Sequence, residues 1–90
     1  MQMGLLWFDN DPQRALDSKI TEAARRYREK FGSVPNTCYV NQKETSGQER
    51  ILSLSGLSNA KLHVVPVHNV LPHHFWVGVE DKSSVVSARS

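Results

Sequence analysis

Hydrophobic residues follow different periods in different parts of the chain, and these periods predict its elements. Residues 3–8 form a short apolar run that ends in a polar turn, which is typical of a strand buried on both faces. Between residues 12 and 31 the apolar positions recur at helical spacing within one arc of about 100°, which predicts an amphipathic helix. Its apolar stripe consists of Leu16, Ile20, Ala23, Ala24, Tyr27 and Phe31.

Residues at both ends of this helix indicate where it begins and ends. Asp11 is a favourable N-cap, and Pro12 suits the first helical position, where its missing N–H has no partner to lose. Gly32 offers a left-handed C-terminal cap, and Pro35 prevents the helix from continuing. We therefore expect the helix to span residues 12–31.

The next segment allows two interpretations. Ser46 and Glu49 have the spacing of a capping box, and Gly56 is placed to end a helix, so a second helix is predicted over residues 47–55. The alternation of leucine and serine over residues 52–55 favours a strand instead.

Short strands are predicted on both sides of this segment. Residues 37–40 are good strand formers, and residues 41–45 are polar and predicted to form a loop. Residues 61–67 and 73–80 both alternate between apolar and polar side chains, and the five residues 68–72 between them fit a hairpin loop.

The resulting order of elements is β-α-β-α-β-β. A strand, a helix and a strand in succession favour a parallel pair joined by a right-handed crossover. The expected fold class is α/β (α+β), a two-layer sandwich with a mixed four-stranded sheet and both helices on one face. We expect a single domain over residues 1–81 and a flexible tail over residues 82–90.

A hairpin loop at residues 68–72 would pair Val67 with His73 and would put Leu62, Val64 and Trp76 on one face. Two short helices cannot cover both faces of the sheet. Either loops or the C-terminal tail cover part of the second face, or that face is an interface, where exposed aromatic patches are common. We therefore expect a non-enzymatic module that binds a protein partner or a second copy of itself, as a homodimer. The candidate binding residues are Leu62, Val64, His73, His74, Phe75 and Trp76.

The composition of the chain excludes several classes of protein. The chain has 90 residues, of which 39% are hydrophobic and 22% charged, and one cysteine, so it fits one globular domain without an intrachain disulfide. No apolar run approaches the roughly 18 residues that cross a bilayer, and we expect a cytoplasmic protein without membrane contact. A net charge of +2 does not by itself indicate a nucleic-acid partner.

A metal-dependent enzyme is the alternative. Asp9 and Asp11 follow the first predicted strand, and ligand sites of open α/β sheets lie at the carboxyl ends of strands. Two carboxylates there could hold Mg²⁺ for phosphoryl transfer or hydrolysis, with His73 assisting. The structural interpretation is that Asp11 caps the helix while Asp9 and Asn10 make the turn. The chain contains no complete catalytic motif, so a non-enzymatic role is favoured.

Four histidines lie within twelve residues: His63, His68, His73 and His74. Histidine is the commonest metal ligand, so such a cluster suggests a metal site. Adjacent strand residues such as His73 and His74 point to opposite faces, however, and His63 would lie about 13 Å from His73 at about 3.3 Å per residue. We therefore expect no metal and no cofactor.

The last turns of the first helix are basic, with Arg25, Arg26, Arg28 and Lys30 against Glu29. Cations near a helix C-terminus interact favourably with the helix dipole, which gives this charge a structural reason. A nucleic-acid accessory protein that uses these four residues is the second alternative.

Overall fold

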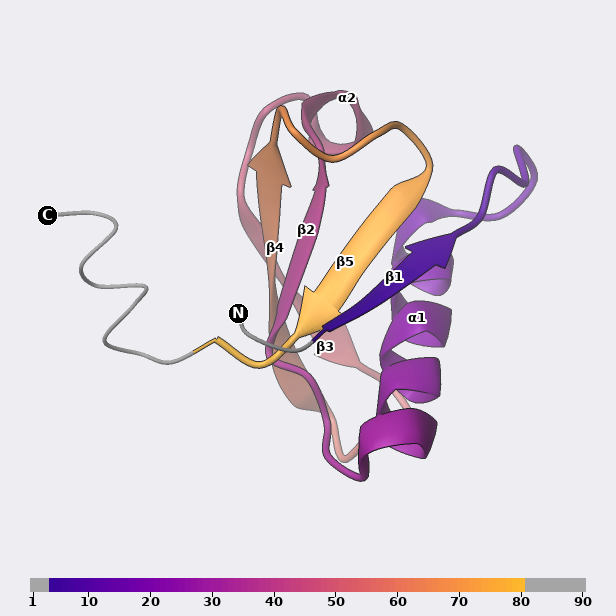
Figure 1. The fold of residues 1–90 in the computed structure, drawn as a ribbon, viewed down its shortest axis with the longest axis vertical. Helices are drawn as coiled ribbons and strands as arrows, with labels where there is room; N and C mark the ends of the chain where they lie inside the picture. Colours follow the sequence, from indigo (N-terminus) through magenta and orange to yellow (C-terminus); the bar gives the residue numbers. More distant parts are fainter. Residues whose placement is uncertain (1–3, 81–90) are drawn as a thin grey trace, which may run out of the picture.

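The computed structural model describes residues 4–80, which fold into a five-stranded mixed sheet with one long helix packed on it (Figure 1). The expected α+β class is confirmed, with five strands instead of four. The predicted tail over residues 82–90 lies outside the described residues. The elements are β1 (Gly4–Phe8), α1 (Leu16–Phe31), β2 (Thr37–Asn41), α2 (Gln42–Thr45), β3 (Arg50–Leu54), β4 (Ala60–Val67) and β5 (His74–Gly78).

The strand order is β1-β5-β2-β4-β3, so the last strand lies between the first two. β5 runs antiparallel to both β1 and β2, and β4 runs parallel to β2. The predicted hairpin between residues 61–67 and 73–80 is therefore wrong, because β2 separates these strands. The predicted pairing of Val67 with His73 does not form, and Val67 pairs with Asn41 instead.

Polar groups near the end of β2 hold the β4–β5 connection across that strand. The side-chain amide of Asn41 donates to the Val70 carbonyl at 2.8 Å. The Glu44 carboxylate accepts the backbone N–H of His73 at 2.9 Å. His73 takes the left-handed conformation, with φ of 66°, at the point where the chain turns into β5. The connection therefore crosses over a neighbouring strand, although its length also suits a hairpin.

The predicted second helix over residues 47–55 is wrong, because Arg50–Leu54 form β3 and pair antiparallel with β4. The alternation of leucine and serine decides the outcome, since Leu54 is fully buried while Ser53 points away from the core. The predicted loop over residues 41–45 instead contains α2. Ser46, expected to begin a helix, ends this one in the left-handed conformation.

α1 begins at Leu16, four residues later than predicted. Asp9 Oδ1 accepts the backbone N–H of Asp11 at 3.0 Å, and Asp11 Oδ1 accepts that of Gln13 at 2.9 Å. These two consecutive Asx turns give the backbone a non-helical alternative. The predicted C-terminus is correct, since Gly32 has φ of 80° and its N–H donates to Arg28.

The core lies between α1 and one face of the sheet. It contains the predicted apolar stripe of α1, of which Ile20 and Tyr27 are buried and Leu16 and Phe31 are half-buried. The first strand is not buried on both faces as predicted, because β1 is an edge strand with Leu6 and Phe8 exposed. α1 spans 16 residues, and no helix within residues 4–80 is long and apolar enough to cross a membrane.

Candidate binding face

The pairing register decides which side chains lie on the face of the sheet that points away from α1. Tyr39 on β2 is opposite both Val65 and Trp76, and Trp76 on β5 is opposite Leu6. Directly paired residues point to the same side of a sheet, so these side chains form one continuous row across four strands. We call this side the open face. Its apolar, aromatic and histidine side chains are Leu6, Phe8, Tyr39, Ile51, His63, Val65, Val67, His74 and Trp76. The same registers also put Thr37, Asn41, Ser53 and Lys61 on this face.

Three of the predicted binding residues lie in the core and not on the open face. Leu62, Val64 and Phe75 are fully buried in the core beneath α1. The predicted hairpin register aligned Leu62 and Val64 with Trp76, but Val64 pairs with Cys38 on β2 and with Arg50 on β3, on the covered face. Cys38 is fully buried, as expected of a small core residue, and burial raises the pKa of its thiol.

His74 and Trp76 do lie on the open face, and they anchor an aromatic cluster at its β1–β5 end. The rings of Phe8 and His74 are 4.9 Å apart between centroids and tilted by 53°. Phe8 and Leu6 are 54% and 56% exposed. His73, the remaining predicted binding residue, lies in the turn before β5 and not in the sheet.

A hollow of about 280 Å³ opens beside this cluster, and it is lined by Tyr39, Val67, Asn69, Val70, Trp76 and Glu80. The Tyr39 hydroxyl donates a hydrogen bond to the Glu80 carboxylate. Burial, together with this bond and the Glu80 charge, raises the pKa of Tyr39 to about 12. Small-molecule sites usually measure about 300–1,000 Å³, so the volume of this hollow lies just below that range.

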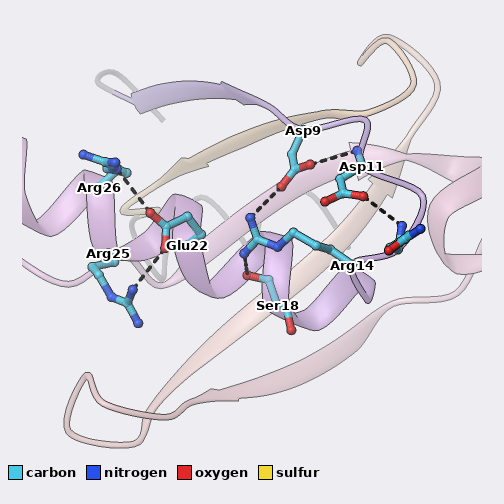
Figure 2. A network of polar contacts seen from close by, with 8 residues as sticks. Asp9, Asp11, Arg14, Ser18, Glu22, Arg25 and Arg26 are labelled. Atoms are coloured by element: carbon cyan, nitrogen blue, oxygen red, sulfur yellow. Dashed lines mark hydrogen bonds and ion pairs between the residues drawn. The ribbon is translucent and has the colours of Figure 1, made fainter.

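Asp9 and Asp11, the predicted metal-binding pair, are held in the turn before α1 (Figure 2). Besides forming its Asx turn, the Asp9 carboxylate accepts a hydrogen bond from the Arg14 guanidinium at 3.1 Å. The same guanidinium donates a second hydrogen bond to the Ser18 carbonyl at 3.4 Å. His73, the proposed assistant, lies beside Glu44, with its Nδ1 at 3.9 Å from that carboxylate. The three predicted catalytic residues are therefore engaged in local structure.

The histidine cluster separates into individual contacts. His63 Nε2 lies 2.8 Å from a carboxylate oxygen of Glu49, whereas His74 Nδ1 lies 2.9 Å from the Pro72 carbonyl oxygen. Within residues 4–80, no three histidine, cysteine, aspartate or glutamate side chains are grouped so that they could hold a metal ion.

The basic end of α1 is partly neutralised by the helix itself. The Glu22 carboxylate accepts hydrogen bonds from the guanidinium groups of Arg25, at 3.0 Å, and Arg26, at 3.2 Å, as Figure 2 shows. The Arg26 guanidinium also lies 5.6 Å from the centre of the Trp7 ring. Pairs three and four residues apart stabilise a helix, so these cations have structural partners. Arg28 and Lys30, the other two predicted nucleic-acid contacts, are exposed.

Sequence reasoning missed the contributions of β1 and β2 to the open face. Leu6 and Phe8 are separated by Trp7, which is also apolar, so the run shows no alternation that would reveal two different faces. Tyr39 follows Cys38 in a segment of only five residues, which is too short for a clear period. The sequence signal that did indicate this face is the group of aromatic and histidine residues next to Trp76.

Comparisons with protein-family models, with curated proteins and with solved structures return no match. The assignment of a site therefore rests on the geometry of this chain.

Proposed function

We propose that this chain is a non-enzymatic protein-binding module whose open face docks against an apolar surface of a protein partner. The observation that carries the proposal is the uneven covering of the sheet. α1 is the only helix longer than four residues within residues 4–80, and it packs on one face. The opposite face presents aromatic and aliphatic side chains from all five strands.

The arrangement of these side chains resembles the centre and rim of an interface. Leu6, Phe8 and Ile51 are each more than half exposed, at 56%, 54% and 68%. Fully burying one such side chain contributes roughly 1.5–3 kcal/mol, so completing the burial of each gives about 1 kcal/mol. The pair of His63 with Glu49 supplies polar groups beside the apolar positions, as at the rim of many interfaces.

The contacts of the acidic residues support a non-enzymatic role. Asp9 and Asp11 each accept a backbone N–H two residues further along the chain, which is what aspartates do in turns. Asp9 also forms an ion pair with Arg14. These contacts explain both carboxylates without a substrate or a metal ion.

The test compares three forms of the full chain: wild type, Phe8→Asp and Arg28→Asp. Proteins retained from an extract of the source organism are identified, purified and titrated against each form by calorimetry. Because Phe8 lies on the open face, we expect Phe8→Asp to weaken the affinity at least tenfold. Arg28 lies on α1, so Arg28→Asp should leave the affinity unchanged.

Circular dichroism must first show that all three forms have the same fold. The proposal is wrong if wild type retains no protein, or if Arg28→Asp and not Phe8→Asp weakens the complex. Retention of a nucleic acid, with an affinity that falls steeply with salt, would favour the basic end of α1 instead.

A further inference from the structure

β1 is an edge strand without the features that usually protect such an edge. Within residues 4–80 it pairs with β5 alone. Its sequence, Gly-Leu-Leu-Trp-Phe, contains no charged residue and no proline, and Leu6 and Phe8 are more than half exposed. Natural edge strands are commonly protected from pairing by charges, prolines or bulges. An uncharged, apolar edge of this kind favours pairing with another strand.

The opposite edge of the sheet is protected. β3 begins with Arg50, which forms an ion pair with Asp17. The Lys61 ammonium on the neighbouring strand donates to the Ser53 hydroxyl at 3.0 Å, so a second charge lies beside this edge. The two edges of one sheet therefore differ in charge, which makes β1 the edge suited to pairing.

The hydrogen bonds between β1 and β5 show which backbone groups point outward. The Asp9 N–H donates to the His73 carbonyl at 3.0 Å, so these opposite residues form a hydrogen-bonded pair. In an antiparallel ladder such pairs alternate with pairs that are not hydrogen-bonded to each other. The N–H and C=O groups of Gly4, Leu6 and Phe8 consequently point away from β5, toward the outer edge.

These three positions are self-complementary. If a second β1 lies antiparallel with a two-fold axis at Leu6, then Leu6 is opposite the partner's Leu6, and Gly4 is opposite the partner's Phe8. All three positions become hydrogen-bonded pairs, and both Leu6 side chains lie on the open face. At Gly4 the partner's Phe8 would lie beside the Trp76 ring, which already covers that glycine, so two aromatic side chains would be neighbours on the open face.

We propose that two copies of this chain pair antiparallel through β1, with the two-fold axis at Leu6, and so join their sheets into one. The two open faces would then form one continuous surface. The pairing stands independently of the proposed function, because it uses backbone groups at the edge and needs no other partner.

The test measures association and amide exchange of the full chain. Sedimentation equilibrium should show a dimer at high micromolar concentration. Hydrogen exchange at the Gly4, Leu6 and Phe8 amides should slow as concentration rises, whereas Leu5 and Trp7 should be protected at every concentration. This alternation is specific to pairing through the outer edge.

Two matched lysine substitutions test the position of the axis. Leu6→Lys places two like charges opposite each other, and we expect it to weaken dimerisation at least tenfold. Ile51→Lys makes the same change at an exposed residue of β3 and should leave dimerisation unchanged. If Leu6→Lys does not fold, Leu6→Pro is the second variant, because it removes only the outward N–H of an edge strand.

Three results would overturn the proposal. The first is a wild type that stays monomeric at high micromolar concentration. The second is a dimer weakened by Ile51→Lys and not by Leu6→Lys. The third is a dimer that Trp76→Glu dissociates and in which the Gly4, Leu6 and Phe8 amides are not slowed. That third result indicates association through the open face, so it contradicts the pairing and leaves the proposed function intact.

Discussion

The indole ring of Trp76 lies against the backbone of Gly4 on the neighbouring strand. A Cβ atom at Gly4 would come within 2.9 Å of Cε2 and Cζ2 of the ring, and within 2.9 Å of the Val77 carbonyl oxygen. Glycine is required here by close approach. The contact also explains why Trp76 is partly buried on a face that no long helix covers.

Gly4→Ala should therefore destabilise the fold. Introducing a methyl group into a filled space typically costs about 1–3 kcal/mol of unfolding free energy, which urea denaturation measures. The same substitution in a Trp76→Leu background is the control, because the smaller side chain removes the clash with the ring and leaves only that with the Val77 carbonyl oxygen, so the loss should be smaller there. An equal loss in both backgrounds would show that the ring does not cause the effect.

Two isoleucines give a matched test of the core. Ile20 is fully buried under the sheet, whereas Ile51 is 68% exposed on β3. Ile20→Ala should lower the free energy of unfolding by about 2–5 kcal/mol, because it removes buried methyl groups and leaves a cavity. Ile51→Ala should cost less than about 1 kcal/mol. Similar losses at both positions would contradict the placement of α1.

The hydrogen bond from Tyr39 to Glu80 predicts a pH dependence at the alkaline end. The pKa of Tyr39 is raised from 10.0 to about 12 in the folded chain. Between these values the unfolded state loses its proton and the folded state keeps it, so stability falls as pH rises from about 10 to 12. The stability difference between wild type and Tyr39→Phe should be constant below pH 10 and shrink above it. A difference that stays constant up to pH 12 would contradict this.

Zinc should neither copurify with the protein in stoichiometric amount nor stabilise it. A ligand that binds only the folded state raises the melting temperature, so Tm measured with and without added zinc is a direct test. The prediction follows from the separate contacts of His63 with Glu49 and of His74 with Pro72. One zinc ion per chain, lost in His74→Ala, would contradict it.

Local signals predicted the helix well because its apolar stripe and its glycine cap act within a few residues. They did not predict its first turn, where the Asp9 and Asp11 side chains take the backbone N–H groups in Asx turns. In residues 47–55 the capping-box spacing predicted a helix, whereas the alternation of leucine and serine predicted a strand. Pairing of Arg50–Leu54 with β4, a tertiary contact, decided between them.

The candidate face was predicted only in part. Trp76 and His74 were identified from their composition, but Leu62 and Val64 were assigned to the wrong side. That assignment assumed that β4 and β5 are adjacent, but β2 lies between them in the sheet, and β2 ends at Asn41, well before β4 begins at Ala60. No local pattern shows whether two consecutive strands are adjacent, because loops of similar length connect both paired strands and strands with another strand between them.

The position of β5 has a consequence for folding during synthesis. β1 and β2 have no hydrogen bonds to each other in the sheet, since β5 fills the place between them. The ladder cannot close until residue 78 has left the ribosome, so β1 and β2 emerge before β5, each with an unpaired edge toward the gap. Such non-local pairing slows folding and exposes nascent strands to aggregation. A nascent chain stalled before β5 has left the ribosome should therefore be sensitive to proteolysis. A longer nascent chain, with β5 outside the ribosome, should be resistant.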